Sequence, residues 1–332
     1  MAAMPSLSDA LDRALADALA EARYPTKRLA DSAQALSHRY RAGVDPTSVV
    51  LDADIAAAAY AAYRMPATHA AVVAALSEVA ALAPDFAPRT VVDIGGGTGA
   101  AVWAAARVWP SLAEATVLDH SAQAMSLGRR LAERADSEAV RRTRWQRASL
   151  GNTELPPTDI ATLSYVLSEL TEKARGSTVR AMAGATLAVV IEPGTPAGYE
   201  RVMAARDELI AAGMHVVAPC PHSGTCPIPR GQDWCHFAAR LGRSALHQRL
   251  KTATLNFEDE KFAYVAAARE PWPTAPARVV RHPLKRKGLV SLRLCGADGL
   301  ADSIVSKRDP AAYRTARDTS WGDPWVTGGN DR

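Results

Sequence analysis

Apolar residues recur at helical spacing through the first quarter of the chain. The earliest run has a leucine at every fourth position, which marks one face of a helix: Leu7, Leu11, Leu15 and Leu19. A second apolar run covers residues 55–63, and Pro66 suits the first turn of a helix that continues over 67–82. We therefore expect residues 7–84 to be helical, and we interpret 1–87 as an N-terminal helical cap on the domain that follows.

Beyond Pro88 the pattern changes to short apolar runs that alternate with helical periodicity. The apolar runs predict strands at 90–94, 115–119, 145–150, 159–166, 185–192, 215–218 and 261–268. Helical periodicity covers 100–108 and 121–135 between the first of these strands. Alternation of this kind is typical of an α/β domain with a doubly wound, largely parallel sheet. We expect this domain to span residues 88–270.

Short strands and basic loops follow the Pro-Trp-Pro sequence at 271–273. The predicted strands are 277–280, 288–294 and 301–305. We interpret residues 271–332 as a small basic β appendage.

Composition and length add limits to this picture. The 332 residues exceed the usual size of a single core, and 48% hydrophobic with 22% charged residues is ordinary for a soluble protein. No window of about 18 uncharged apolar residues occurs, because the longest candidate, 70–83, contains Ser77 and Glu78. The N-terminus lacks the basic and apolar regions of a secretion signal. We expect a cytoplasmic protein without a membrane span.

A glycine-rich loop follows the first predicted strand. It reads Asp93-x-Gly95-x-Gly97-Thr98-Gly99 and precedes a predicted helix. Glycines in such a loop let the backbone approach a ligand closely. The spacing differs from the dinucleotide pattern G-x-G-x-x-G, and no Gly-Lys-Ser/Thr follows it. An acid followed by this spacing resembles class I S-adenosylmethionine-dependent methyltransferases, whereas a structural turn without a ligand is the alternative.

Further candidates for a cofactor crevice lie at the ends of other predicted strands. Asp119 closes the second strand, 20 residues beyond Gly99, where an acid accepts hydrogen bonds from ribose hydroxyls. The alternative for Asp119 is a helix N-cap. His120 would lie at the adenine edge. The remaining candidates end the third and fourth strands: Ser149, Leu150 and Tyr165.

The sequence names no catalytic base. Methylation of exocyclic amino groups usually goes with an Asn/Asp-Pro-Pro-aromatic tetrad after the fourth strand, and residues 164–167 read Ser-Tyr-Val-Leu instead. Glu169 falls on a face that the helix pattern exposes. Glu192 faces the crevice, but it also ends a strand before Pro193. The catalytic residues therefore stay unknown.

Four cysteines form a candidate metal site. Their spacing is C-x5-C-x8-C-x59-C, at Cys220, Cys226, Cys235 and Cys295. The first three lie in a proline-stiffened loop, 219–237. In a reducing compartment this clustering favours metal binding over disulfides. Four thiolates suit a [4Fe–4S] cluster or tetrahedral zinc, and the spacing does not choose between them.

Three alternatives to a four-cysteine metal site are open. The cysteines could be four unrelated structural residues, since buried free cysteines are common although rarely so clustered. His222 and His236 could replace a cysteine in a zinc site, or they could bond to the loop backbone. Cys220 follows a proline, as the nucleophile of RNA cytosine-C5 methyltransferases does. That dipeptide follows the fourth strand in those enzymes and the sixth predicted strand here, which disfavours a covalent role.

Basic side chains gather at three places along the chain. One group recurs along a predicted helix: Arg240, Arg243, Arg249 and Lys251. A second group flanks the third strand: Arg141, Arg142, Arg144 and Arg147. The third lies in the appendage beside His282, and we predict that it binds RNA: Arg278, Arg281, Lys285, Arg286 and Lys287. Such clusters neutralise phosphates without reading sequence, although a solvated surface is the alternative.

Several sequence blocks together resemble one known family. They include YRMPAT at 63–68, EPGTPAG at 192–198, DWCHF at 233–237 and EDEKF at 258–262, beside the glycine loop and the cysteines. These blocks resemble the methyltransferase-like family associated with the small ribosomal subunit, the Rsm-type ribosome assembly proteins of bacteria and mitochondria. The likeness runs from about Tyr63 to Trp325.

The resemblance implies a class I methyltransferase (Rossmann-like) fold that binds S-adenosylmethionine, and a partner in small-subunit rRNA or a pre-30S particle. In mitochondrial members it also implies a four-cysteine [4Fe–4S] site, and the four cysteines fall on those positions. We interpret the chain as an RNA methyltransferase, with a non-catalytic assembly factor as the alternative. The acidic N-terminus, with Asp9, Asp12 and Asp17, is unlike a transit peptide, so we expect a bacterial cytoplasmic protein. We also expect a monomer.

Overall fold

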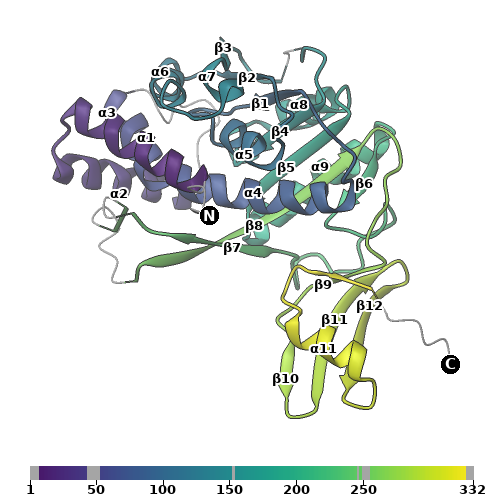
Figure 1. Ribbon diagram of the computed structural model, residues 1–332. Helices are drawn as coiled ribbons and strands as arrows, with labels where there is room; N and C mark the ends of the chain where they lie inside the picture. The colour runs from purple at the N-terminus through teal and green to yellow at the C-terminus, as the bar shows by residue number, and fades with distance from the viewer. Residues whose placement is uncertain (1–6, 43–52, 152–153, 245–246, 249–254, 327–332) are drawn as a thin grey trace.

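Two β-sheets of unequal size organise the chain (Figure 1). The computed structural model describes residues 7–42, 53–151, 154–244, 247–248 and 255–326. The larger sheet has eight strands, and the smaller sheet has five strands.

The strand order of the larger sheet is β3-β2-β1-β4-β5-β8-β6, and β7 pairs with β8. The strands are β1 (Thr90–Ile94), β2 (Glu114–Asp119), β3 (Arg144–Arg147), β4 (Ile160–Ser164), β5 (Leu187–Pro193), β6 (His215–Ala218), β7 (Phe237–Gly242) and β8 (Phe257–Ala268). β1 to β5 are parallel, whereas β8 is antiparallel to β5, β6 and β7. The prediction of a doubly wound, largely parallel sheet is confirmed.

Helices cover both faces of this sheet, because alternate residues of its strands point to opposite faces. Val91 packs into one core with α4 (Met65–Leu82) and α5 (Ala100–Val108). Val92 packs into a second core with α8 (Glu172–Met182) and α9 (Pro196–Ala211). The remaining helices around the sheet are α6 (Ala122–Ala132), the short α7 (Glu138–Arg141) and the 3-10 turn η1 (Leu167–Glu169).

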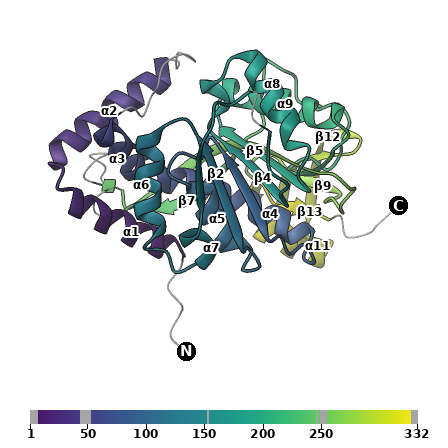
Figure 2. The same ribbon diagram turned by 90° about the horizontal axis from the view of Figure 1, so that it is seen from above.

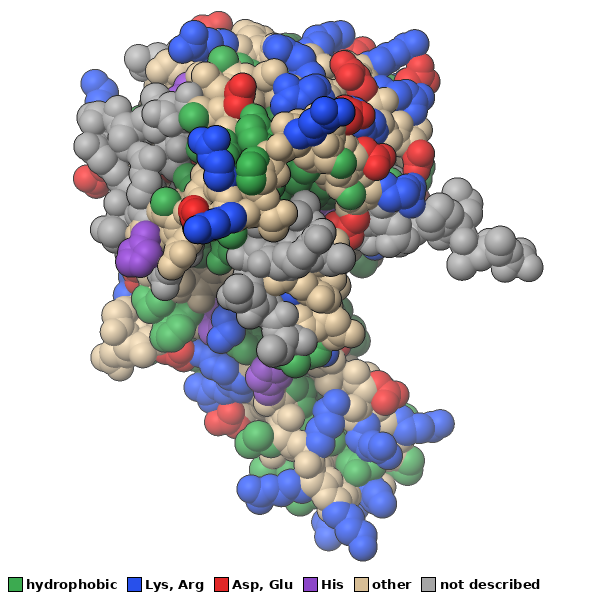
Figure 3. All heavy atoms as spheres, turned by 90° about the vertical axis from the view of Figure 1, so that its left-hand side faces the viewer, with side chains coloured by type: hydrophobic (Ala, Val, Ile, Leu, Met, Phe, Trp, Pro, Cys, Tyr) green, Lys and Arg blue, Asp and Glu red, His purple; other side chains and the backbone are tan. Residues whose placement is uncertain are grey.

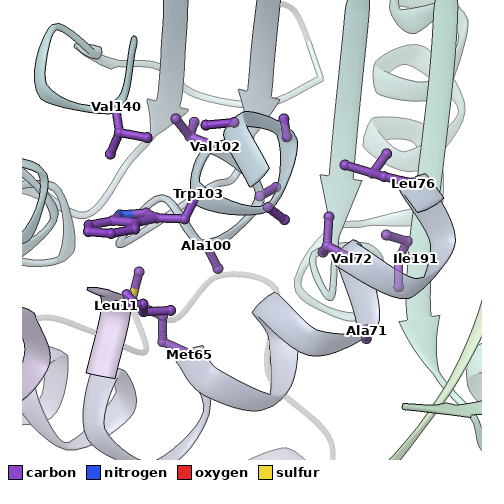
Figure 4. Packing of buried hydrophobic residues seen from close by; sticks show 14 of the residues in the cluster. Leu11, Met65, Ala71, Val72, Leu76, Ala100, Val102, Trp103, Val140 and Ile191 are labelled. Atoms are coloured by element: carbon purple, nitrogen blue, oxygen red, sulfur yellow. The ribbon is translucent and has the colours of Figure 1, made fainter. Parts of the chain in front are cut away.

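The N-terminal helices extend the first core. They are α1 (Leu7–Ala22), α2 (Thr26–Ala42) and α3 (Asp54–Tyr63). Leu11 of α1 lies beside Met65 and Trp103, and all three side chains are buried (Figure 4). Figure 2 shows these three helices grouped on one side of the molecule and α8 and α9 on the other. The predicted helical cap therefore packs directly onto the α/β domain.

Helix α4 has the length and composition of a membrane span. It has 18 residues, and more than half of it is buried inside the fold. The core helices of soluble proteins share these properties, so the helix is weak evidence for a membrane location. Its one acidic residue, Glu78, forms an ion pair with the buried Arg278.

The small β appendage lies below the larger sheet in Figure 1. Its strands are β9 (Ala277–Val279), β10 (Leu284–Arg286), β11 (Leu289–Gly296), β12 (Gly299–Ser306) and β13 (Pro324–Trp325). The sequence did not predict α11 (Pro310–Asp318), which packs Tyr313 and Ala316 against the sheet around Val290 and Leu292. The appendage thus has a core of its own.

The predicted basic helix around residue 240 is wrong. Residues 237–242 form strand β7, in which Phe237 and Ala239 are buried while Arg240 is exposed. Arg240 pairs with Asp259 at 2.8 Å, on the adjacent strand. Arg249 and Lys251, the other members of that predicted group, lie outside the described residues.

Candidate functional site

The glycine loop joins β1 to α5 at the point where the strand order reverses. β1 lies between β2 and β4, so the carboxyl ends of neighbouring strands leave a crevice there, the usual ligand position in open α/β sheets. Three of its glycines adopt positive φ angles of 65°, 53° and 84°: Gly95, Gly97 and Gly99. A Cβ on Gly96 would lie 2.4 Å from Asp93 Oδ2. The loop is therefore packed tightly over the first acid.

Asp119 holds the same loop from the end of β2. Its Oδ2 accepts the backbone N–H of Gly97 at 2.8 Å, and its Oδ1 accepts that of Ser121 at 2.7 Å. The N-cap of α6 is Ser121, whose hydroxyl accepts the N–H of Ala124 at 3.1 Å. The alternative of a helix cap at Asp119 is therefore wrong, and its carboxylate lies against the loop.

Asp93 supports the loop from inside the sheet. It is 1% exposed, and Thr162 donates its hydroxyl to Asp93 Oδ1 at 2.9 Å. Burial raises the pKa of Asp93 to about 7, and the hydrogen bond from Thr162 opposes part of that rise. Asp93 is therefore present in both its protonated and its ionised form near neutral pH.

The loop contains a buried polar atom without a partner. Thr98 is 1% exposed, and its Oγ1 forms no hydrogen bond. Buried hydroxyls normally find a partner, so this one fits a loop built against a polar ligand. Together with positive-φ glycines and Asp119, the residues present fit an adenosyl cofactor.

The other predicted crevice residues differ in burial. His120 is exposed, with Nδ1 3.7 Å from Asp119 Oδ1. Ser149 is exposed and Leu150 half-buried, both just beyond β3. All three lie near the carboxyl ends of β2 and β3, on the side where we predicted the adenine.

Tyr165 follows β4 and joins an ion pair that the sequence did not reveal. Its hydroxyl donates to Glu260 Oε1 at 3.0 Å, and Arg64 donates to both oxygens of Glu260, at 2.9 and 3.2 Å. The Arg64 guanidinium also lies 5.5 Å from the centre of the Tyr165 ring. Burial and the neighbouring carboxylate raise the pKa of Tyr165 well above 10. Arg64 lies in the YRMPAT block and Glu260 in the EDEKF block, and these two blocks were the signal in the sequence that could have pointed to the pair.

Glu192 is engaged in structural contacts. It is fully buried, and its carboxylate accepts the N–H of Leu167 at 3.0 Å and Nε of Arg201 at 2.6 Å. Burial raises the pKa of Glu192, and the pairing with Arg201 opposes that rise. The hydrogen bond from Leu167 joins the turn that follows β4 to strand β5, on which Glu192 lies.

The four cysteines line a single cavity of about 30 Å³, which is room for one or two waters. Cys295 lies on β11 of the appendage, directly opposite Arg278 of β9, and the other three come from the loop 219–237. Burial raises the pKa of Cys295 to about 12 and that of Cys235 well above 9. Such groups are thiols unless a cation binds them.

The side chains at the cavity include the four thiol groups that a four-thiolate metal site requires. The cavity is lined by all four cysteines and by neither histidine of the loop. His236 lies instead between Trp234 and Trp321, at ring distances of 5.4 and 4.6 Å. Within the described ranges, no three His, Cys, Asp or Glu side chains stand close enough to hold a metal ion. The four sulfur atoms would have to come closer together to do so.

The predicted RNA-binding residues divide into two groups. Arg278 is 2% exposed and donates to the carbonyls of Pro219 and Gly322, so its assignment to a basic surface loop is wrong. Arg281 is partly exposed and pairs with Asp233. The others are exposed at the β10–β11 hairpin, without an ion pair in the part of the chain described: Lys285, Arg286 and Lys287.

A sequence comparison settles the family of the chain. Residues 54–326 match the profile of the family described as Rsm22, mitochondrial small ribosomal subunit Rsm22. The chain belongs to the Rsm22 family. The match includes the glycine loop, Asp119, the Arg64–Glu260 pair and all four cysteines.

Two curated relatives of this Rsm22-family chain are mitochondrial. It is 32% identical over 289 residues to the human protein named ribosome assembly protein METTL17, mitochondrial, covering 80% of this chain and 61% of that one. It is 28% identical over 184 residues to Rsm22-cox11 tandem protein 2, mitochondrial, of Schizosaccharomyces pombe, covering 41% and 24%. The chain thus spans under two thirds of the length of either relative.

Solved methyltransferase structures also align with the Rsm22-family chain. Magnesium protoporphyrin IX methyltransferase from Synechocystis PCC 6803, with bound SAH, aligns over 62% of this chain and 85% of its own. The TM-score is 0.41 and the identity 11%. Values this low say nothing of a shared substrate.

Proposed function

We propose that this chain is an S-adenosylmethionine-binding, methyltransferase-like protein that acts on small-subunit rRNA or a pre-30S particle during ribosome assembly. Membership in the Rsm22 family supports the assembly role. The observation that supports cofactor binding is the geometry of the glycine loop, which lies where the strand order reverses. The loop packs on Asp93 and donates a hydrogen bond to Asp119. A cytoplasmic location and a monomeric state remain predictions, which cell fractionation and light scattering test.

Each part of the loop has a defined task toward the cofactor. Asp119 has carboxylate lone pairs left to accept ribose hydroxyls while it holds Gly97. The unpartnered hydroxyl of Thr98 offers a further polar contact. Asp93 packs closely against Gly96, where a side chain would not fit. When bound, S-adenosylmethionine supplies an electrophilic methyl group.

We propose that the four cysteines hold a [4Fe–4S] cluster, with zinc as the alternative metal. The support is the donor set, since four thiols from two distant parts of the chain face one cavity. Cysteine thiolates are the ligands that hold both kinds of centre. Such a site would link the loop 219–237 to β11 of the appendage. Metal analysis of protein purified without oxygen distinguishes iron with sulfide from zinc.

We propose that the appendage carries the RNA contact. Lys285, Arg286 and Lys287 are exposed, and Lys307 and Arg308 lie exposed beyond the neighbouring strand β12. Figure 3 shows Lys and Arg side chains gathered over the appendage, with few acidic ones among them. Such a surface attracts phosphates by charge and does not read base sequence.

The non-catalytic assembly factor is the second candidate function, and the turn after β4 favours it. Tyr165 donates to Glu260, which is paired with Arg64, and Glu192 is paired with Arg201. These groups are committed to structural contacts, so none of them is a ready general base. A methyl acceptor that needs deprotonation would lack help from these side chains.

One experiment separates the two functions. Small-subunit rRNA from wild-type and deletion strains is digested and its modified nucleosides compared by mass spectrometry. A methylated nucleoside that is lost on deletion, and restored by wild-type protein but not by Asp119→Ala, supports the methyltransferase. Unchanged rRNA methylation together with defective small subunits supports the assembly factor.

A further inference from the structure

Two buried arginines stand beside the four cysteines. Arg206 comes from α9 and Arg278 from β9, and both line the cysteine cavity. Each side chain is only 3% exposed. A guanidinium keeps its charge in proteins, so two full positive charges lie at the wall of this cavity.

The two charges are compensated differently. Arg278 pairs with Glu78 and donates to the carbonyls of Pro219 and Gly322, at 3.0 and 2.8 Å. Its charge therefore has a carboxylate of its own. It also stands directly opposite Cys295 in the β9–β11 register.

Arg206 has no buried carboxylate partner among the described residues. Its Nη2 donates to the carbonyls of His222 and Gly224, at 3.1 and 2.5 Å. Its Nε is buried and forms no hydrogen bond. The one acid near it is Asp207, 3.6 Å away, whose side chain is 57% exposed. Its charge is therefore met by two carbonyls and one exposed carboxylate, and by no buried counter-charge among the described residues.

The cavity wall supplies no negative charge of its own. Besides the two arginines and the four cysteines, it consists of apolar side chains, prolines and two tyrosines, and it contains no Asp, Glu or His. Neutral thiols would leave the charge of Arg206 in this cavity without a buried counter-charge, which is costly. Four thiolates around a divalent core carry a net charge of about −2. Arg206 and the Glu78-paired Arg278 would together offset part of that charge, and Arg206 would offset the larger share.

We propose that Arg206 and Arg278 are the counter-charges of an all-cysteine, dianionic metal centre, and that Arg206 acts mainly through its charge. This inference rests on the cysteine site proposed above. Arg206 is a positioning residue, because it also ties the carbonyls of the loop 222–224 to α9. If the metal is an iron–sulfur cluster, Arg206 raises its reduction potential, because reduction adds negative charge.

The test compares Arg206→Gln, Arg206→Lys and the control Arg230→Gln in full-length protein purified without oxygen. Arg230 is a cation of the same loop that is 52% exposed and pairs with Glu200 and Asp207. The readouts are metal per chain, the rate of metal loss to a chelator and, for iron, the reduction potential. Circular dichroism checks that each variant is folded.

We expect Arg206→Gln to lose metal roughly tenfold faster than wild type, the usual size of an outer-shell effect. An iron centre in this variant should also show a more negative potential. Arg206→Lys, which keeps the charge and loses the planar pair of donors, should stay near wild type, as should Arg230→Gln. If Arg206→Gln does not fold, metal retention by Arg206→Lys decides the question.

Different outcomes overturn the two proposals. A metal-bound wild type with unchanged metal loss in Arg206→Gln leaves the cysteine site standing and overturns the counter-charge. Equal metal loss in Arg206→Lys and Arg206→Gln also overturns it, because hydrogen bonding would then be the whole effect. A wild-type protein without metal at the four cysteines overturns the site, and the counter-charge with it.

Discussion

Gly97 donates its backbone N–H to Asp119 Oδ2 over 2.8 Å, which joins the third glycine of the loop to the end of the second strand. A loop residue with positive φ is thereby fixed by a carboxylate that also faces the crevice. Binding of a cofactor would need little further ordering of this loop, because the chain has already fixed it.

Asp119→Ala should weaken S-adenosylmethionine binding by about 1–3 kcal/mol. The substitution removes an acceptor for the ribose and leaves the N–H of Gly97 without its partner. Isothermal titration calorimetry measures the change, and thermal unfolding shows whether the fold is kept. Unchanged affinity in a folded variant would contradict the assignment of Asp119.

Gly97→Val should abolish binding of the same cofactor. A β-branched residue strains a backbone with φ of 53°, and its side chain would fill the space where the ligand approaches the loop. Gly213→Val is a matched control, because Gly213 also has a positive φ and lies outside the loop, with open space around it. Calorimetry on both variants separates loss of the site from strain in general.

The free energy of unfolding should fall as the pH rises toward neutrality because of Asp93. Its pKa is about 7 when folded against 3.8 ordinarily, so between these values the folded chain binds more protons than the unfolded chain. This one group can contribute a slope of up to about 1.4 kcal/mol per pH unit, which ends above the folded pKa. Urea unfolding at a series of pH values from about 4.5 to 8 gives the free energy of unfolding as a function of pH. This curve should be flatter for Asp93→Asn than for wild type. Parallel curves would contradict the raised pKa.

Cys295→Ser should loosen the appendage if the cysteines share a metal. It removes the one ligand that β11 contributes, while the other three remain in the loop 219–237. Limited proteolysis should then cut faster in the exposed segment around residues 271–273, and RNA binding should weaken while cofactor affinity is kept. Unchanged cleavage would contradict a clamp between the loop and the appendage.

Replacing Lys285, Arg286 and Lys287 together by Ala should weaken binding to a small-subunit rRNA fragment. The slope of log affinity against log salt should fall by about 2–3, close to one for each lost phosphate contact. Arg142→Ala is the control, because Arg142 is exposed but pairs with Glu138. Arg278→Ala should instead lower the free energy of unfolding, since it leaves buried partners unpaired.

The sequence was informative where local pattern decides the structure. Buried strands such as 187–193 appear as apolar runs, and the glycine loop has its own spacing. Strand β7 was mistaken for a helix because Arg240 and Arg243, which directly follows the strand, stand three residues apart, as on a helix face. The buried alternation of Phe237 and Ala239 was the stronger signal.

Long-range partners set the limit of such predictions. Arg278 is charged and lies among basic neighbours, yet it is buried because Glu78, 200 positions earlier, pairs with it. The Arg64–Glu260 pair is separated by 196 positions. No local sequence pattern encodes a contact between residues so far apart. The burial of Arg278 and the contacts of Tyr165 could therefore be found only in the structure.

The placement of β8 dictates the order in which the chain can fold during its synthesis. β5 leaves the ribosome about 60 residues before its neighbour β8, and β6 has no partner strand until β8 arrives. The half of the sheet from β1 to β5 can form early, with one edge open. An exposed edge of apolar strand is prone to aggregate, so a newly made chain depends on prompt closure by residues 257–268.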